Sequence, residues 1–255
     1  MYGIEKKVFE QLLNLKNKFN LHGVKAEFEA EGSTFRDIMR LRRLTSMADV
    51  KLFLKIGGVE AVRDIKDSLE LGVDGLIAPM VETSFGAKKF IDACKSVYKN
   101  HKIHLSINIE TKNAIEEIDS ILDFAKDKID NITLGRTDLS ASYFDKNIVP
   151  DSDFILKLLK DIGVKAHKRG LTFTVGGSIS TITVDKFRKN SYSVQHVSKL
   201  ETRKIILPIG VAIDSKNAIR EALKFEELYI LSKKELSDLF IEPEISRLIK
   251  LTRRL

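Results

Sequence analysis

The segments INIET (residues 107–111) and ITLGRTDLS (residues 132–140) are apolar, strand-like runs that each lead into a carboxylate. If they form neighbouring parallel strands, Glu110 and Asp138 lie side by side at one edge of a sheet, because such strands are about 4.8 Å apart. Hard cations such as Mg²⁺ bind one or two protein carboxylates and leave other positions for substrate oxygens. The two segments therefore predict a divalent-metal site and make the chain a candidate enzyme.

Strand-like segments alternate with helix-period segments along nearly the whole chain, which is typical of parallel β-structure with crossover helices. The expected strands lie at residues 24–30, 52–56, 75–80, 104–110, 132–135, 172–176, 194–200 and 204–209. Helices expected between them include residues 34–47, where Thr34 and Asp37 have capping-box spacing, and residues 114–126. Eight strands predict an α/β fold, a (β/α)8 TIM barrel.

The chain of 255 residues is expected to form one TIM-barrel domain, since 43% hydrophobic residues provide a sizeable core. An N-terminal helix precedes the barrel, which spans about residues 23–210 and closes by placing strand 204–209 beside strand 24–30. Two later helices, residues 215–231 and 233–255, form a C-terminal helical extension over about residues 214–255.

Composition excludes several classes of protein. The net charge of +7 comes from Lys and Arg residues spread along the chain, without the basic stripe and interleaved aromatics of a nucleic-acid binder. The single cysteine, Cys94, rules out an intrachain disulfide and is expected to be buried. The N-terminus is charged and amphipathic, unlike a signal peptide or membrane span, so we expect a cytoplasmic protein without nucleic-acid or membrane partners.

Charged residues gather where the predicted strands end, and active sites of such barrels lie at the carboxyl ends of the strands. Alternation along the first strand puts Lys25, Glu27 and Glu29 on one face. Other strand ends contribute Lys55, Asn108, Glu110, Arg136, Asp138, Gly176, Gly177, Ser178, Glu201, Thr202 and Arg203. Because isolated buried charges are costly, these groups indicate a site; the alternative is a structural ion-pair network around the rim.

The segments GVDGLIAPMVET (residues 72–83), INIET and GRTDLS resemble the HpcH/HpaI aldolase and citrate lyase β-subunit family, metal-dependent lyases built on a phosphoenolpyruvate/pyruvate-type barrel. The likeness extends over about residues 23–206. It implies that Glu110 and Asp138 hold Mg²⁺ or Mn²⁺, which chelates a small 2-oxo acid, and that Asn108 lies beside the metal. It also implies a homo-oligomer, either a trimer or a hexamer.

Further site residues are expected around this metal. Asn108, Gly135, Arg136 and Arg203 are substrate-binding candidates, and Arg203 either binds a carboxylate or phosphate of the substrate or pairs with Glu27 or Glu29. Lys55 is expected to be both catalytic and substrate-binding, because it occupies the place of the family's enolate-stabilising arginine. An ammonium supplies the charge of that arginine but not its planar fork.

The group that transfers the proton is the main departure from the family. The aldolase branch carries a histidine where this chain has Ala30. The carboxylates of Glu29 and Glu31, or a water molecule, are the candidates in its place, and the expected catalytic set is therefore Lys55, Glu29, Glu31 and Arg203.

The function expected from these features is that of a class II aldolase, a metal-dependent carbon–carbon lyase acting on a pyruvate-type enolate and an aldehyde acceptor. Three alternatives remain open at this point. One is a citrate lyase-like acyl-CoA lyase, the second is a Schiff-base enzyme using Lys25 or Lys55, and the third is a catalytically silent barrel that serves as a binding subunit.

Overall fold

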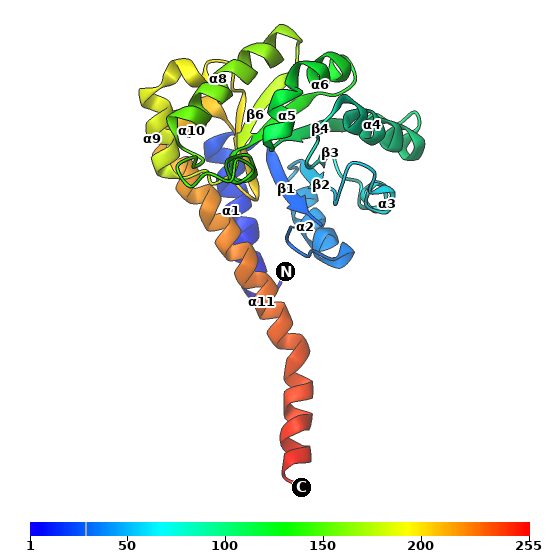
Figure 1. The fold of residues 1–255 in the computed structure, drawn as a ribbon. Coiled ribbons are helices and arrows are strands. Elements are labelled where there is room, and N and C mark those ends of the chain that lie inside the picture. The colour runs from blue at the N-terminus through cyan, green and yellow to red at the C-terminus, as the bar shows by residue number, and fades with distance from the viewer. Residues whose placement is uncertain (29) are drawn as a thin grey trace.

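The computed structural model describes residues 1–28 and 30–255. Within these residues eight strands form a closed barrel in the order β1 to β8, with helices around it (Figure 1). The strands are β1 (Gly23–Glu27), β2 (Leu52–Lys55), β3 (Gly75–Ala78), β4 (His104–Ile109), β5 (Asn131–Gly135), β6 (Thr172–Gly176), β7 (Lys199–Glu201) and β8 (Ile205–Pro208). The predicted α/β TIM-barrel fold is confirmed.

The helices begin before the barrel and continue beyond it. They are α1 (Gly3–Phe19), α2 (Phe35–Met47), α3 (Val62–Leu71), α4 (Ser84–Tyr98), α5 (Lys112–Glu116), α6 (Ile118–Ala125), α7 (Arg136–Ala141), α8 (Asp153–Lys168), α9 (Thr181–Lys189), the 3₁₀ helix η1 (Ser191–Val194), α10 (Ile209–Asp214) and α11 (Lys216–Thr252). The capping box predicted for Thr34 and Asp37 is present at the start of α2. No helix of the described residues is long and apolar enough to cross a bilayer.

The eighth strand does not follow the parallel pattern expected for the whole barrel. From β1 to β7 each strand is parallel to the next, whereas β8 is antiparallel to both β7 and β1. Only residues 202–204 separate β7 from β8, and the Thr202 N–H donates a hydrogen bond of 2.9 Å to the Ile205 carbonyl. A turn this short can join antiparallel strands, while a parallel pair needs a crossover of a dozen or more residues.

Several element boundaries also differ from those expected. The helix expected at residues 114–126 is divided into α5 and α6, and β3 ends at Ala78 rather than at residue 80. The first strand ends at Glu27 rather than at residue 30. The seventh strand is shorter than predicted, because η1 occupies its expected start and pairing begins only at Lys199. The two C-terminal helices expected at residues 215–231 and 233–255 are one continuous helix, α11, with Pro243 inside it.

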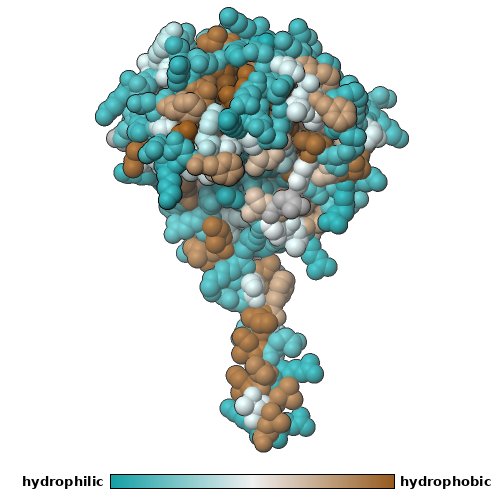
Figure 2. Space-filling model, viewed as in Figure 1, coloured by the Kyte–Doolittle hydropathy of each residue, from teal (hydrophilic) through white to brown (hydrophobic). Residues whose placement is uncertain are grey.

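Helix α11 packs along α1 and then extends well past the barrel, as the orange to red ribbon in Figure 1 shows. Gln11 and Asn14 of α1 both donate hydrogen bonds to the Glu221 carboxylate of α11, at 2.6 and 3.0 Å. Every residue from 237 to 255 is exposed. We call residues 237–255 the α11 tail; apolar residues cover much of its visible surface (Figure 2).

The inside of the barrel is more polar than the branched apolar filling usual for this fold. The Asn131 side chain donates to Ser106 Oγ at 2.8 Å and accepts from Thr174 Oγ1 at 2.8 Å, and all three residues are buried. Near the amino-terminal ends of the strands, the Phe53 ring fills the space that Cβ atoms at Gly23 and Gly75 would need. The barrel is thus plugged by an aromatic ring at one end and is polar towards the other.

Candidate active site

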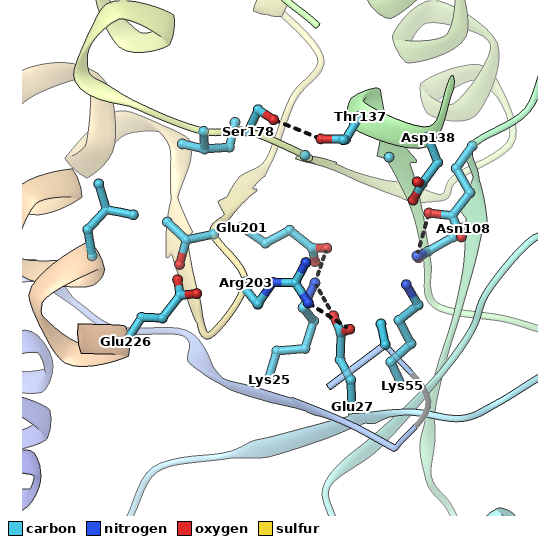
Figure 3. A pocket seen from close by; sticks show the side chains of 17 residues that line it. Lys25, Glu27, Lys55, Asn108, Thr137, Asp138, Ser178, Glu201, Arg203 and Glu226 are labelled. Carbon is cyan, nitrogen blue, oxygen red and sulfur yellow. Dashed lines mark hydrogen bonds and ion pairs between the residues drawn. The ribbon is translucent and has the colours of Figure 1, made fainter. Parts of the chain in front are cut away.

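A pocket of about 400 Å³ opens at the carboxyl ends of the strands. Its charged and polar lining residues include Lys25, Glu27, Lys55, Asn108, Glu110, Thr137, Asp138, Ser178, Glu201, Thr202, Arg203 and Glu226 (Figure 3). Lys55, Asn108, Glu110, Gly135, Asp138 and Arg203 of the expected site therefore converge on one cavity. A pocket of this size accommodates a small metabolite.

Glu110, directly after β4, is fixed by its neighbours on both sides. Its Oε1 accepts a hydrogen bond of 3.0 Å from the Met80 N–H, and its Oε2 accepts one of 3.1 Å from the Asn108 amide. Met80 reaches this position with a φ of 50°, which is uncommon for a residue other than glycine. The carboxylate is therefore held in one orientation beneath the pocket.

The pKa of Glu110 is raised above its ordinary value, mainly because the carboxyl is buried. The positive charge of Lys55 and the Met80 hydrogen bond act in the opposite direction, while the negative charge of Asp138 raises the pKa further. A buried carboxylate with a second carboxylate close to it forms a place where a cation is stabilised.

Asp138 reaches the same pocket from the first turn of α7, the short helix that follows β5. In Figure 3 its carboxylate lies next to the Asn108 side chain. Asn108 is 3% exposed, and its Oδ1 atom has no hydrogen-bond partner among the described residues. Buried amide oxygens normally have a partner.

These three side chains fit a hard divalent cation. Two carboxylates and a free amide oxygen are the ligand types that Mg²⁺ and Mn²⁺ prefer, and Mg²⁺ usually keeps several waters besides one or two carboxylates. Within the described residues no group of three or more His, Cys, Asp or Glu side chains is arranged so that it could hold a metal ion. Glu110 and Asp138, with Asn108 beside them, are thus the residues that would hold the metal.

Lys25, Glu27 and Glu201 form a buried ionic cluster on the opposite side of the pocket. Lys25 Nζ lies 2.9 Å from Glu201 Oε1 and 3.3 Å from Glu27 Oε1. Burial alone would lower the pKa of Lys25, but the two carboxylates outweigh it and raise the pKa above the ordinary value. Lys25 therefore stays protonated and is unsuited to attack a carbonyl carbon, in contrast to the Schiff-base alternative.

Arg203 follows β7 and extends over this cluster, where its Nη1 lies 3.7 Å from Glu27 Oε2. Of the two roles expected for Arg203, pairing with Glu27 is the one seen in the structure. Lys55, at the end of β2, instead points towards Asn108 and Asp138 (Figure 3). Its ammonium therefore lies on the same side of the pocket as the two candidate metal ligands.

Two expected site residues lie elsewhere. Arg136 is fully buried, and its guanidinium donates to the carbonyls of Gly176, Gly177 and Pro150 and pairs with Asp151. Its side chain therefore holds the loops after β5 and β6 together and does not line the pocket.

Glu31 pairs with the buried Lys204, which lies over the Tyr229 ring at 4.6 Å from its centre. Glu31 is not among the residues lining the pocket. Glu29, also expected to be catalytic, lies outside the described residues.

The lining residues that were not singled out from the sequence include Thr137, Leu223 and Glu226. Thr137 Oγ1 lies 2.9 Å from Oγ of the expected Ser178 at the rim, and Leu223 and Glu226 reach the pocket from α11. A Cβ atom at Gly177 would lie 2.5 Å from the Thr137 nitrogen, so the two loops touch through their backbones. Nothing in the local sequence of α11 indicates that it passes the barrel mouth.

Comparisons with known proteins agree with this geometry. The model of the HpcH/HpaI aldolase/citrate lyase family matches residues 29–196, and the chain belongs to this family. A hydroxypyruvate/pyruvate aldolase of Roseobacter denitrificans is 28% identical over 143 residues, which cover 45% of this chain and 55% of that protein. The chain thus spans little more than half the length of that relative.

Solved structures support the same fold. An HpcH/HpaI aldolase of Desulfitobacterium hafniense has a TM-score of 0.62 at 18% identity, covering 79% of this chain and 82% of the other. An aldolase/citrate lyase family protein of Burkholderia cenocepacia has a TM-score of 0.61 at 13% identity, covering 86% of this chain and 89% of the other.

Proposed function

We propose that the protein is a divalent-metal-dependent lyase that makes or breaks a carbon–carbon bond between a 2-oxo acid and an aldehyde. The observation that carries this proposal is the convergence of Glu110, Asp138 and the unpartnered Asn108 oxygen at one pocket. Membership of the aldolase/citrate lyase family supports it, as does the relative that is named an aldolase for hydroxypyruvate and pyruvate.

In this proposal Glu110 and Asp138 would hold Mg²⁺ or Mn²⁺, which would supply Lewis-acid chemistry to the 2-oxo group. The Lys55 ammonium adds positive charge on the same side of the pocket, where the enolate oxygen becomes negative. In bond formation the enolate carbon joins the aldehyde carbon, and the aldehyde oxygen takes up a proton. In cleavage the hydroxyl gives up that proton, and the electron pair of the broken bond returns to the enolate.

We propose the group that transfers the proton by considering which carboxylates are already paired with a cation. Glu31 is engaged by Lys204, and Glu27 and Glu201 are engaged by Lys25. A carboxylate held by a cation is a weaker base than a free one, because the ion pair stabilises its charged form. Of the candidates expected from the sequence, Glu29 and a water molecule therefore remain as the proposed proton-transfer groups.

The decisive experiment separates metal binding from chemistry. Glu110→Gln and Asp138→Asn remove one charge each with little change of shape, and Asp161→Asn makes the same change at an exposed position of α8. We expect the first two variants to bind Mn²⁺ at least about tenfold more weakly, measured by electron paramagnetic resonance. Both should also lose metal-dependent deuterium exchange into the pyruvate methyl group, measured by NMR.

Asp161→Asn should behave as the wild type in both measurements. Full exchange activity in either Glu110→Gln or Asp138→Asn would contradict the proposal, as would a wild-type protein that exchanges no deuterium with Mg²⁺ or Mn²⁺ present.

We also propose that the protein is a homo-oligomer in which the α11 tail pairs with a second copy. The tail carries exposed Ile241, Ile245 and Leu248 at spacings of four and three residues, which places them on one helix face. An exposed apolar face of this kind marks an interaction surface.

Charge supports an antiparallel pair in particular. Glu242 and Arg253 are eleven residues apart, close to three helical turns, so both flank the apolar face on the same side. In an antiparallel pair each Glu242 then faces Arg253 of the second copy.

A further inference from the structure

The pocket has two sides with different chemistry, and the proposed function uses only one of them. Asn108, Asp138 and Lys55 lie on one side in Figure 3, and Glu226 lies on the other, with Arg203 between them. A metal-bound 2-oxo acid would occupy the first side. The second, outer side is then free for the acceptor aldehyde, and the inference below rests on the proposed function in this respect.

The cations on the outer side are already neutralised. Lys25 contacts Glu201 at 2.9 Å and Glu27 at 3.3 Å, and Arg203 contacts Glu27 at 3.7 Å. Two cations thus face two carboxylates, and this group of four side chains has no net charge. A substrate carboxylate at this place would have to compete with Glu27 for Arg203.

Glu226 adds a carboxylate that this cluster does not neutralise. It is half-buried, lines the pocket from α11, and has no hydrogen bond or ion pair with any other described residue. Burial raises its pKa, and the charges of Arg203 and Lys204 oppose this rise. The adjacent Phe225 is fully buried, so the backbone that carries Glu226 is anchored against the barrel.

Leu223 lies three residues before Glu226, on the same side of α11, and also lines the pocket. The outer wall therefore combines one apolar side chain with one hydrogen-bond-accepting carboxylate. Carboxylate oxygens accept hydrogen bonds and donate none when ionised. The matching ligand has a short carbon chain and donates hydrogen bonds at its far end.

We propose that the outer side is the acceptor subsite, and that Glu226 selects aldehydes bearing hydroxyl or ammonium groups over aldehydes that end in a carboxylate. A hydroxyl or ammonium group gains a hydrogen bond to Glu226, which is stronger than a neutral one because the acceptor is charged. A carboxylate group of the aldehyde would be repelled by Glu226, and Arg203 already pairs with Glu27. Selectivity then comes from attraction and repulsion together.

A binding experiment tests the subsite without any reaction. The metal-free protein is titrated with 3-amino-1,2-propanediol and with glycerate, and dissociation constants are measured by ligand-observed NMR. We expect the wild type to prefer the aminodiol, and Glu226→Gln to reduce this preference roughly tenfold, because one attraction and one repulsion are lost together. Glu227→Gln makes the same charge change one residue further on, at an exposed position, and should keep the wild-type preference.

Aldol additions provide the second measurement. With pyruvate and Mg²⁺, kcat/KM is compared for glyceraldehyde and 4-oxobutanoate in the same three proteins. The ratio should favour glyceraldehyde in the wild type and in Glu227→Gln, and fall by about tenfold in Glu226→Gln.

The two measurements separate this inference from the proposed function. Tighter binding of glycerate, or equal changes in Glu226→Gln and Glu227→Gln, would overturn the acceptor subsite even if the aldol reaction proceeds. Conversely, a wild type that shows no aldol reaction but a Glu226-dependent preference for the aminodiol would refute the lyase while the selectivity of the subsite stands.

Discussion

A Cβ atom at Gly135 would lie 2.4 Å from the Oε2 atom of Glu110. The two residues end neighbouring strands of the barrel, and the carboxylate occupies the space that any other residue at position 135 would fill. The contribution of Gly135 to the site is therefore steric, because it leaves room for Glu110 to lie flat beside β5.

Gly135→Ala should displace the Glu110 carboxylate from its bonds to Met80 and Asn108. We expect Mn²⁺ affinity to fall at least about tenfold and pyruvate deuterium exchange to fall with it. Gly210→Ala is the control, since a Cβ atom there meets nothing within 4 Å. Unchanged Mn²⁺ affinity in Gly135→Ala would show that Glu110 does not hold the metal in this orientation.

Lys25→Met should destabilise the fold by about 3–5 kcal/mol, because it leaves two buried carboxylates without their cation. Urea denaturation measures this change. Adding Glu27→Gln and Glu201→Gln to Lys25→Met removes both stranded charges and should restore part of the stability. A triple variant that is less stable than Lys25→Met alone would contradict this account.

His22 should make stability depend on pH. Burial, followed by the charges of Lys199, Lys51 and His104, lowers the pKa of His22 from 6.5 to about 4. Between these values the unfolded chain binds more protons than the folded one, so the free energy of unfolding decreases as the pH falls from 6.5 to 4. NMR titration should give a midpoint near the lower value.

A matched pair of variants isolates this effect. His22→Gln should lose less stability between pH 7 and pH 4.5 than the wild type does. His101→Gln, at an exposed position, should lose as much as the wild type. Identical pH dependence in all three proteins would rule out His22 as the source.

Leu248→Glu should disrupt the proposed pairing of the α11 tail, because it places a charge within the apolar face. Light scattering after size-exclusion chromatography should show a smaller species than the wild type. Lys250→Glu changes a residue on the opposite face of the helix and should leave the assembly intact. A monomeric wild type, or a Leu248→Glu variant of unchanged mass, would refute the pairing.

The repeating alternation of strands and helices was sufficient to predict the barrel, and the ends of the fourth and fifth strands were sufficient to predict that Glu110 and Asp138 share its mouth. Both follow from local patterns, because the carboxyl ends of parallel strands lie at one edge whatever the rest of the chain does. The alternation of Lys25 and Glu27 in β1 likewise placed both side chains towards the interior.

The direction of β8 was missed although the sequence holds a signal for it. The expected strands at residues 194–200 and 204–209 are too close for a parallel crossover, and their spacing favours a hairpin. The positions of Arg136 and Glu226 could not be predicted from the sequence for a different reason. Arg136 turns away to meet Asp151 in a distant loop, and Glu226 reaches the pocket only because α11 packs against the barrel beside β8.

The hairpin of β7 and β8 has a mechanical consequence. Strand β8 runs back towards the amino-terminal ends of the other strands, so α11 has to run along the outside of the barrel to bring Glu226 to the pocket. The same helix continues without a break into the α11 tail. A second copy bound to the tail, as proposed, would therefore be connected to the proposed acceptor subsite through one continuous helix.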